Sequence, residues 1–315
     1  MPDLPGIGEA PYLTNTSMLA LDHVPEHLVV VGGGYVGLEF AQMYRRFGAK
    51  VTIVERGPRL VPHEDEDVSE AIREVLQRED VAVRTSAECI RLAPDAHGVA
   101  VGLNCVEGEF TTVGSHVLLA AGRRPNTDDL GLEKAGVATD ARGYITVDDR
   151  LATNVPGIWA LGECNGHGAF THTAYNDFEI VAANLLAGEQ RRLSDRIPAH
   201  ALYIDPPLGQ VGMTEREARA SGRPLLMGKL PMTRVSRAVE NDETQGFMKV
   251  IVDAGTRRIL GAAILGTGGD EAIHGILDIM NAGVPNDVLE RAAPIHPTVS
   301  ELIPTVLNEL QPIGP

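Results

Sequence analysis

The sequence predicts an α/β protein in which two architectures follow one another along the chain. Between residues 26 and 121, short apolar runs alternate with helical patterns, as expected for a parallel sheet covered by helices. From residue 197 onward, strand patterns come first and helices come last, which is typical of an α+β domain. The length of 315 residues leaves room for about two domains.

The first region follows a βαβαβ order with an antiparallel insertion. His27–Val31 is a short apolar run that predicts a buried parallel strand, and Leu38–Phe47 predicts a helix that ends at Gly48. Residues 64–80 are largely acidic with apolar side chains at helical spacing, so we expect an amphipathic helix with a solvated charged face. Further strands are predicted at 51–55, 81–84 and 117–121, and a β-meander at 88–112 with turns at 95–98 and 107–108.

The remainder of the chain divides near residue 196. Residues 122–196 are mostly polar loops, with one helix predicted at Asp177–Leu186. Beyond them, strands are predicted at 201–204, 225–230, 246–252 and 259–265, followed by helices at 270–282, 288–291 and 299–310. Pro304 lies inside the last of these helices, so we expect a kink there.

Composition and charge exclude several classes of function. The net charge of −16 repels a polyanion such as nucleic acid. No run of about 18 apolar residues occurs, so no membrane span is expected, and the first ten residues lack the pattern of a secretory signal. The three cysteines, Cys89, Cys105 and Cys164, are scattered, which favours a reducing, cytoplasmic location over a disulfide scaffold.

A glycine-rich turn follows the first predicted strand. Gly32, Gly34 and Gly37 have the G-x-G-x-x-G spacing, and the turn opens a helix, as a dinucleotide-binding site of the Rossmann type requires. The helix amino end offers unpaired N–H groups to a pyrophosphate. Glu55 ends the second strand at the position of a ribose-binding carboxylate, which favours NAD over NADP, although the adjacent Arg56 weakens this preference.

The alternative interpretation of this segment is a glycine-rich strand–helix turn beside a solvated Glu55. Two neighbours of the glycines also leave alternatives open. Glu39 lies one turn into the helix and either faces the site or is solvated, and Tyr35 either stacks on the nicotinamide side of a cofactor or packs elsewhere.

Near the carboxyl end, His296 and Glu301 form a candidate acid–base pair. A histidine titrates near neutrality and suits proton transfer, and a carboxylate five residues on can orient its ring. Alternatively, Thr298 and Glu301 form a capping box that opens the last helix.

Cys164 and His167, with His172 nearby, have a spacing seen in metal sites, but a fourth ligand is missing, so we expect no metal.

Together these residues resemble the pyridine nucleotide–disulfide oxidoreductases, the family of dihydrolipoamide dehydrogenase, glutathione reductase and mercuric reductase. The stretch from Gly32 to Glu39 is similar to the family's NAD cradle, and Glu55 to its ribose carboxylate. His296 and Glu301 are similar to its base and orienting acid. The resemblance also implies cofactor contacts at Gly122 after the NAD domain, and at Gly162, Glu163, Ala169, Phe170, Thr171 and His172 of the second flavin motif.

The resemblance implies both the domain plan and the function. Residues 1–25 would be a crossover, 26–121 the NAD-binding domain, 122–196 a remnant of the FAD domain, and 197–315 an α+β dimerisation domain. The implied enzyme is a homodimeric, FAD- and NAD(P)H-dependent disulfide oxidoreductase.

We expect this chain to lack the N-terminal FAD lobe and the redox cysteine pair, and to be inactive alone. The alternatives are a non-catalytic NAD-binding and dimerisation module, or half of a split reductase whose partner is a separate N-terminal FAD lobe.

Overall fold

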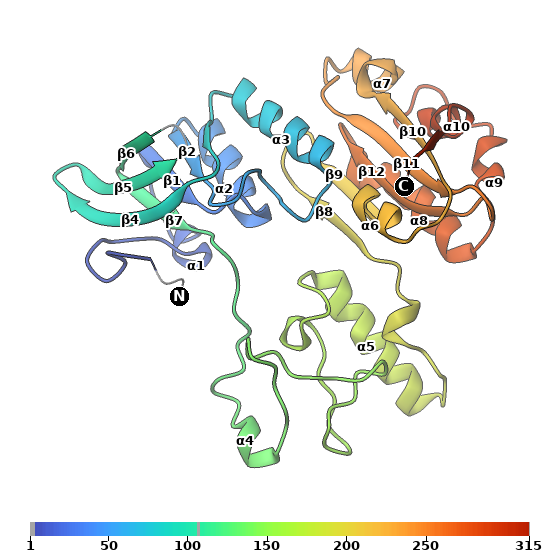
Figure 1. Cartoon of the computed structure of the whole chain (residues 1–315), viewed down its shortest axis with the longest axis horizontal. Helices are drawn as coiled ribbons and strands as arrows, with labels where there is room; N and C mark the ends of the chain where they lie inside the picture. Colours follow the sequence, from blue (N-terminus) through green and yellow to red (C-terminus); the bar gives the residue numbers. More distant parts are fainter. Residues whose placement is uncertain (1–3, 106–107, 315) are drawn as a thin grey trace. The chain divides into compact units, whose positions relative to one another are not determined.

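The computed structural model describes residues 4–105 and 108–314. It divides into two compact units (Figure 1). The main unit comprises Met1–Gly122 together with Ala199–Pro315, and the central unit comprises Arg123–Pro198. No helix among the described residues is both long and apolar enough to cross a membrane.

The amino-terminal part of the main unit is built on a four-stranded parallel sheet. Its strands run in the order β3 (Ala82–Arg84), β2 (Lys50–Val54), β1 (His27–Val31) and β7 (His116–Leu119). Every residue of β1 is buried. This pattern arises because the sheet is covered on both faces, as parallel sheets require.

Alternate residues of β1 enter different cores. Leu28 and Val30 pack with apolar residues of α2 (Tyr35–Arg46) and α3 (Glu66–Arg78), whereas Val29 and Val31 pack with an antiparallel meander. The meander strands are β4 (Glu88–Asp95), β5 (Gly98–Cys105) and β6 (Gly108–Gly114), and a short α1 (Asn15–Met18) precedes β1. The predicted turn at 95–98 is present, whereas the predicted turn at 107–108 includes Glu107, which lies outside the described residues.

The carboxyl-terminal part of the main unit contains a six-stranded antiparallel sheet (Figure 1). Its strand order is β13 (Gln311–Ile313), β10 (Leu225–Pro231), β11 (Phe247–Asp253), β12 (Ile259–Leu265), β9 (Leu208–Gly212) and β8 (Ala199–Leu202). The predicted α/β class with an α+β second domain is therefore confirmed. Sequence patterns did not reveal β9 and β13, which are short and contain glycine or proline.

Five α-helices accompany this sheet. Their bounds are α6 (Glu215–Ala220), α7 (Ser236–Glu240), α8 (Gly269–Ala282), α9 (Asp287–Glu290) and α10 (Ile303–Asn308), with 3-10 turns η3 (Met232–Arg234) and η4 (Ser300–Leu302). The expectation of one kinked helix over 299–310 is wrong. Pro304 lies in the first turn of α10, where proline has no N–H to lose from the helical hydrogen bonds, and η4 precedes it.

Helix α6 begins with a capping box that its sequence encodes. The Thr214 side chain accepts a hydrogen bond from the N–H of Glu217 at 3.2 Å, and the N–H of Thr214 donates to Glu217 Oε2 at 2.9 Å. We expect Thr214→Ala to lower the free energy of unfolding by about 1 kcal/mol, because the Glu217 N–H loses its partner. Urea unfolding checks this value, with the exposed Thr233→Ala as control; equal midpoints for both variants would contradict the cap.

The central unit is mostly irregular. It contains α4 (Leu132–Ala135), α5 (Thr171–Leu186) and the 3-10 turns η1 (Glu163–Asn165) and η2 (Leu193–Asp195). Helix α5 begins six residues before the predicted start at Asp177, so Thr171 and His172 belong to its first turn. Asp177 is 2% exposed and accepts hydrogen bonds from the N–H of Gly162 at 2.9 Å and from Asn165 Nδ2 at 2.8 Å, which ties α5 to the turn before it.

Candidate functional site

The glycine turn between β1 and α2 is shaped by close packing of backbone. A Cβ atom on Gly37 would lie 2.2 Å from the carbonyl oxygen of Gly32, so only glycine lets α2 approach the turn this closely. Gly34 is the N-cap of α2, and a Cβ atom added there would meet nothing within 4 Å. No side chain caps the amino end of α2, and its first turn carries no acidic residue. The turn therefore leaves an open, partially positive helix end that suits an anion.

The carboxylate of Glu55 is fixed beside this turn. Its Oε2 accepts a hydrogen bond from the N–H of Gly33 at 2.6 Å, and its Oε1 accepts one from the N–H of Gly57 at 2.6 Å. Glu55 directly follows β2, so the end of the sheet positions it. Each carboxylate oxygen keeps a further lone pair, which can accept a hydrogen bond from a hydroxyl group.

Tyr35 and Glu39 lie on a face of α2 that contacts the region around β8. Glu39 Oε1 accepts a hydrogen bond from the N–H of Tyr203 at 3.0 Å. The Tyr35 hydroxyl donates to Glu64 and lies 2.9 Å from His200 Nε2, and the Tyr35 and His200 rings stack at 5.6 Å. Burial, and then the charge and hydrogen bond of Glu64, raise the pKa of Tyr35 well above its ordinary value. The roles of Tyr35 and Glu39 in binding a nucleotide stay predictions.

The acidic run before α3 differs from its expected solvated state. Glu64 and Asp65 lie just before the helix and are only 2% and 8% exposed. Glu64 also lies 2.8 Å from His200 Nε2. The prediction of a solvated face was wrong at these two positions, because each carboxylate has a partner far away in the chain: His200 for Glu64 and Lys249 for Asp65, in addition to the nearer Tyr35. Neither Glu64 nor His200 belongs to a local motif that could have signalled the contact.

His296 and Glu301 meet at the other end of the main unit. His296 Nδ1 lies 2.8 Å from Glu301 Oε2, the His296 side chain is 72% exposed, and the Glu301 side chain is 12% exposed. The reciprocal capping box is incomplete: the Thr298 backbone interacts with the Glu301 carboxylate, but η4 has no side-chain cap, and the Thr298 hydroxyl donates to the carbonyl of Ile295 at 2.7 Å. The Thr298 hydroxyl therefore does not complete the capping box, and the acid–base role of His296 and Glu301 stays a prediction.

The central unit brings Glu163 together with Arg123. The guanidinium and carboxylate groups approach at two points, 2.6 Å between Nε and Oε1 and 2.7 Å between Nη2 and Oε2. Glu163 follows Gly162, whose N–H donates to the buried Asp177. Sequence reasoning missed Asp177, although a carboxylate on an otherwise apolar helix face is a recognisable signal of a buried polar contact.

The segment from Ala169 to His172 leads into α5. The Phe170 and His172 rings stack at 5.4 Å, and Thr171 and His172 occupy the first turn of the helix. Gly122 is exposed, with φ of +112°. Burial raises the pKa of the Cys164 thiol, which donates to the carbonyl of Leu161.

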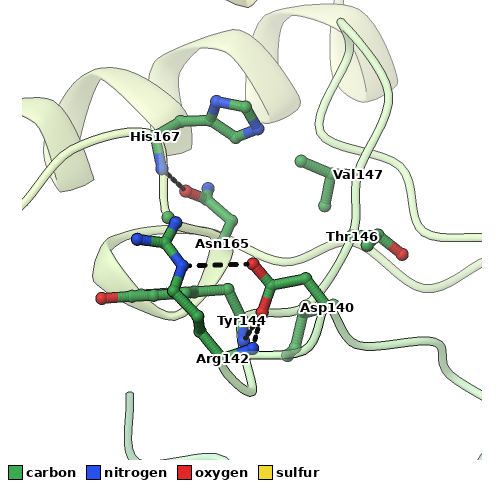
Figure 2. Close-up of a pocket in the computed structure, with 9 residues that line it drawn as sticks. Asp140, Arg142, Tyr144, Thr146, Val147, Asn165 and His167 are labelled. Atoms are coloured by element: carbon green, nitrogen blue, oxygen red, sulfur yellow. Dashed lines mark hydrogen bonds and ion pairs between the residues drawn. The ribbon is translucent and has the colours of Figure 1, made fainter. Parts of the chain in front are cut away.

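A pocket of the central unit has a volume of about 210 Å³ (Figure 2). Figure 2 shows that a turn organised by Asp140 forms one side of it, and the Asp140 carboxylate accepts from the N–H groups of Arg142 and Tyr144. Asn165 and His167 line it as well. Glu163 and Ala169–His172 are not among its lining residues, so we assign it no cofactor.

Comparisons with known proteins identify relatives along nearly the whole chain. The sequence model described as pyridine nucleotide-disulphide oxidoreductase matches residues 1–177, and the model of that family's dimerisation domain matches residues 198–307. A probable pyridine nucleotide-disulfide oxidoreductase, RclA of Escherichia coli (strain K12), is 37% identical over 305 residues, covering 96% of this chain and 68% of the relative. A mercuric reductase of Streptomyces lividans is 34% identical over 302 residues, covering 96% of this chain and 64% of the relative.

Solved structures give the same result. The structure of the HOCl-induced flavoprotein disulfide reductase RclA from Escherichia coli matches with a TM-score of 0.90 and 35% identity, over 98% of this chain and 71% of that one. The chain thus spans about two thirds of the length of its relatives. The comparisons do not bear out the expected lack of an N-terminal FAD lobe and cysteine pair, nor do they support a separate lobe as a partner.

Flavoprotein disulfide reductases use FAD and a pyridine nucleotide, and the matched dimerisation domain contains every strand of the six-stranded sheet except β13. The glycine turn, the fixed carboxylate and the paired histidine all lie inside the matched regions. The chain therefore belongs to the pyridine nucleotide–disulphide oxidoreductase family and carries that family's dimerisation domain.

Proposed function

We propose that this chain binds NAD at the turn from Gly32 to Gly37, as part of a homodimeric, FAD- and NAD(P)H-dependent disulfide oxidoreductase. The observation that carries the proposal is the uncapped amino end of α2 at Gly34, open to solvent beside a glutamate held by two backbone N–H groups. The open helix end binds the pyrophosphate. Glu55 then accepts hydrogen bonds from the adenine ribose hydroxyls.

When FAD is bound, its flavin would supply the electron-transfer chemistry between the nicotinamide and a disulfide. In this chain, Gly122, Gly162, Glu163 and the segment Ala169–His172 would line part of the flavin site, as the resemblance implies. The two hydrogen bonds that Asp177 accepts from the Gly162–Asn165 turn support this role, because they hold the turn rigidly. Glu163 would exchange its Arg123 partner for a flavin hydroxyl.

His296 would act as the acid–base group that moves a proton to and from a thiol. Because Nδ1 faces Glu301, the ring presents Nε2 to solvent. In a homodimer this nitrogen would serve the thiol site of the partner subunit, so that residues 197–315 contribute to catalysis as well as to dimerisation. We propose the four parts 1–25, 26–121, 122–196 and 197–315 as the functional division of the chain, in a cytoplasmic enzyme.

The nucleotide site is tested by Gly34→Ala. The backbone at Gly34 has φ of −86°, and the added methyl meets no atom of the protein, so the fold should be unchanged. The methyl occupies the space that the pyrophosphate needs, and we expect the Kd for NADH to rise at least about tenfold. Calorimetric titration and thermal unfolding measure both quantities.

Gly275→Ala is the matched control, because its Cβ atom also meets nothing within 4 Å. We expect this variant to bind NADH as the parent chain does. The proposal fails if the parent chain has no NADH affinity, or if Gly34→Ala binds as tightly as the control.

Coenzyme choice is tested at Glu55. Glu55→Gln keeps the side-chain length but removes the negative charge that repels a 2′-phosphate. We expect the ratio of NADH to NADPH affinity to fall by about tenfold or less. The reason is that the interaction of one partly solvent-exposed carboxylate with a phosphate contributes on the order of 1 kcal/mol. Parallel titrations with the two coenzymes measure the ratio, and an unchanged ratio would count against a coenzyme role for Glu55.

A further inference from the structure

The loop from Ile295 to Glu301 holds an exposed imidazole in one orientation. His296 is 72% exposed, and exposed side chains on loops ordinarily sample several rotamers. Here the ring is restrained through Nδ1, which lies 2.8 Å from Glu301 Oε2. The orientation of the imidazole therefore depends on what holds the Glu301 carboxylate and the loop backbone.

Helix α7 supplies contacts to both. Arg237 Nη2 donates to the carbonyl of Pro297 at 2.9 Å, directly after His296 in the chain. The side chain of the preceding residue, Ser236, and the backbone of Thr298 both favour the ionised form of the Glu301 carboxylate and lower its pKa. Within the loop, the Thr298 hydroxyl closes the turn onto Ile295. Two consecutive side chains of one short helix thus act on the loop at Pro297 and at Glu301, both of which follow His296 in the chain.

Electrostatics agree with this arrangement. Desolvation raises the pKa of Glu301, but the hydrogen bond and charge of His296, together with Ser236 and the Thr298 backbone, lower it below its ordinary value, so the carboxyl stays ionised at neutral pH. Arg237 also forms an ion pair with Glu240 at 3.4 Å, on its own helix. The charged side chains of η4 and α7 are Glu301, Arg237 and Glu240, and of these Glu301 forms the ion pair with His296.

We propose that Ser236 and Arg237 are positioning residues for His296. Ser236 orients the Glu301 carboxylate, Arg237 fixes the Pro297 carbonyl, and together they keep Nδ1 of the imidazole toward Glu301 and Nε2 toward solvent. The use of this imidazole in catalysis rests on the proposed function, but its orientation does not. The assignment adds two residues of α7 to a site that sequence spacing confines to residues 296–301.

The test is the protonation pattern of His296 in the full chain, measured by ¹⁵N NMR on histidine-labelled protein, with His296→Gln identifying the signal. The parent should show a neutral imidazole protonated at Nδ1, because the Glu301 carboxylate accepts that proton. Ser236→Ala and Arg237→Gln should each mix the two tautomers.

Glu240→Gln is the matched control, because it removes the ion pair of Arg237 without touching the Pro297 contact. It should leave the tautomer unchanged. Glu301→Gln marks the full effect of losing the carboxylate charge. The proposal is overturned if Glu301→Gln changes the His296 signals while Ser236→Ala and Arg237→Gln, both folded by circular dichroism, leave them as in the parent. NADH titration of the same variants reports on the proposed function separately, because the glycine turn is unaltered in them.

Discussion

Replacing Lys249 with methionine is expected to lower the free energy of unfolding by about 3–5 kcal/mol, the cost of breaking a buried ion network. The Lys249 side chain is 1% exposed, on strand β11. Its Nζ lies 2.8 Å from Asp65, 2.8 Å from Asp67 and 3.4 Å from Glu215. Methionine fills similar volume but leaves these carboxylates without their central cation.

The matched control is Lys229→Met on the adjacent strand. Lys229 and Lys249 are directly paired across β10 and β11, and Asp67 lies between the two ammonium groups. The Lys229 side chain is 38% exposed, so solvent screens its ion pair with Asp67. We expect a loss of about 1 kcal/mol or less for this variant. Equal losses for the two lysines in urea unfolding would contradict the assignment of Lys249 as the buried centre of the network.

The pH dependence of the network has a definite sign. Desolvation raises the pKa of Asp67, but hydrogen bonds from Lys229 and Lys249 lower it by more, so its folded pKa lies below the unfolded one. This contribution to stability is present above the unfolded pKa, about 4, and is lost as the pH falls through the folded pKa. We therefore expect the difference between the parent and Lys249→Met to shrink on acidification below pH 4.

Replacing Gly37 with valine is expected to lower the free energy of unfolding by about 3 kcal/mol. The added side chain overpacks the contact between α2 and the Gly32 turn and forces the two backbone segments apart. The new Cβ would lie 2.2 Å from the Gly32 carbonyl oxygen, 3.2 Å from Val30 and 3.3 Å from Ala120. Helix α2 would have to move away from β1, and the glycine turn would open. NADH affinity should fall together with stability.

Thermal unfolding and NADH titration of the same samples measure the two effects. Gly34→Ala is the informative comparison, because it should lose affinity and keep the parent's unfolding midpoint. Gly37→Val should lose both. A Gly37→Val protein with the parent's midpoint would show that the close approach of α2 to Gly32 is not needed for the fold.

The glycine turn could be predicted from sequence because its parts are neighbours in the chain. A buried strand, three spaced glycines, a helix and an acid after the next strand all fall between residues 27 and 55. Each part has a local reason, such as the Cβ that Gly37 must lack. The pairing of His296 with Glu301 was likewise within reach, because only five residues separate them.

Local patterns could not show which charges are buried. The run that starts at Glu64 is indistinguishable from a solvated helix face until its partners are known. Asp65 is held by Lys249, 184 positions away, and Glu64 by His200, 136 positions away. The reciprocal capping box is incomplete for a similar reason, since the alternative hydrogen bonds of its residues depend on how the loop folds.

The order of residues alone thus determined the alternation of strand and helix, the glycine turn and the chemistry available at each end of the chain, since these follow from side-chain type and short spacing. Tertiary structure decided which acids are buried, how α7 restrains the loop at His296, and that Asp177 organises the turn at Gly162. The physical reason is that burial of a polar group is favourable only with a partner, and the partner's place is a property of the folded chain.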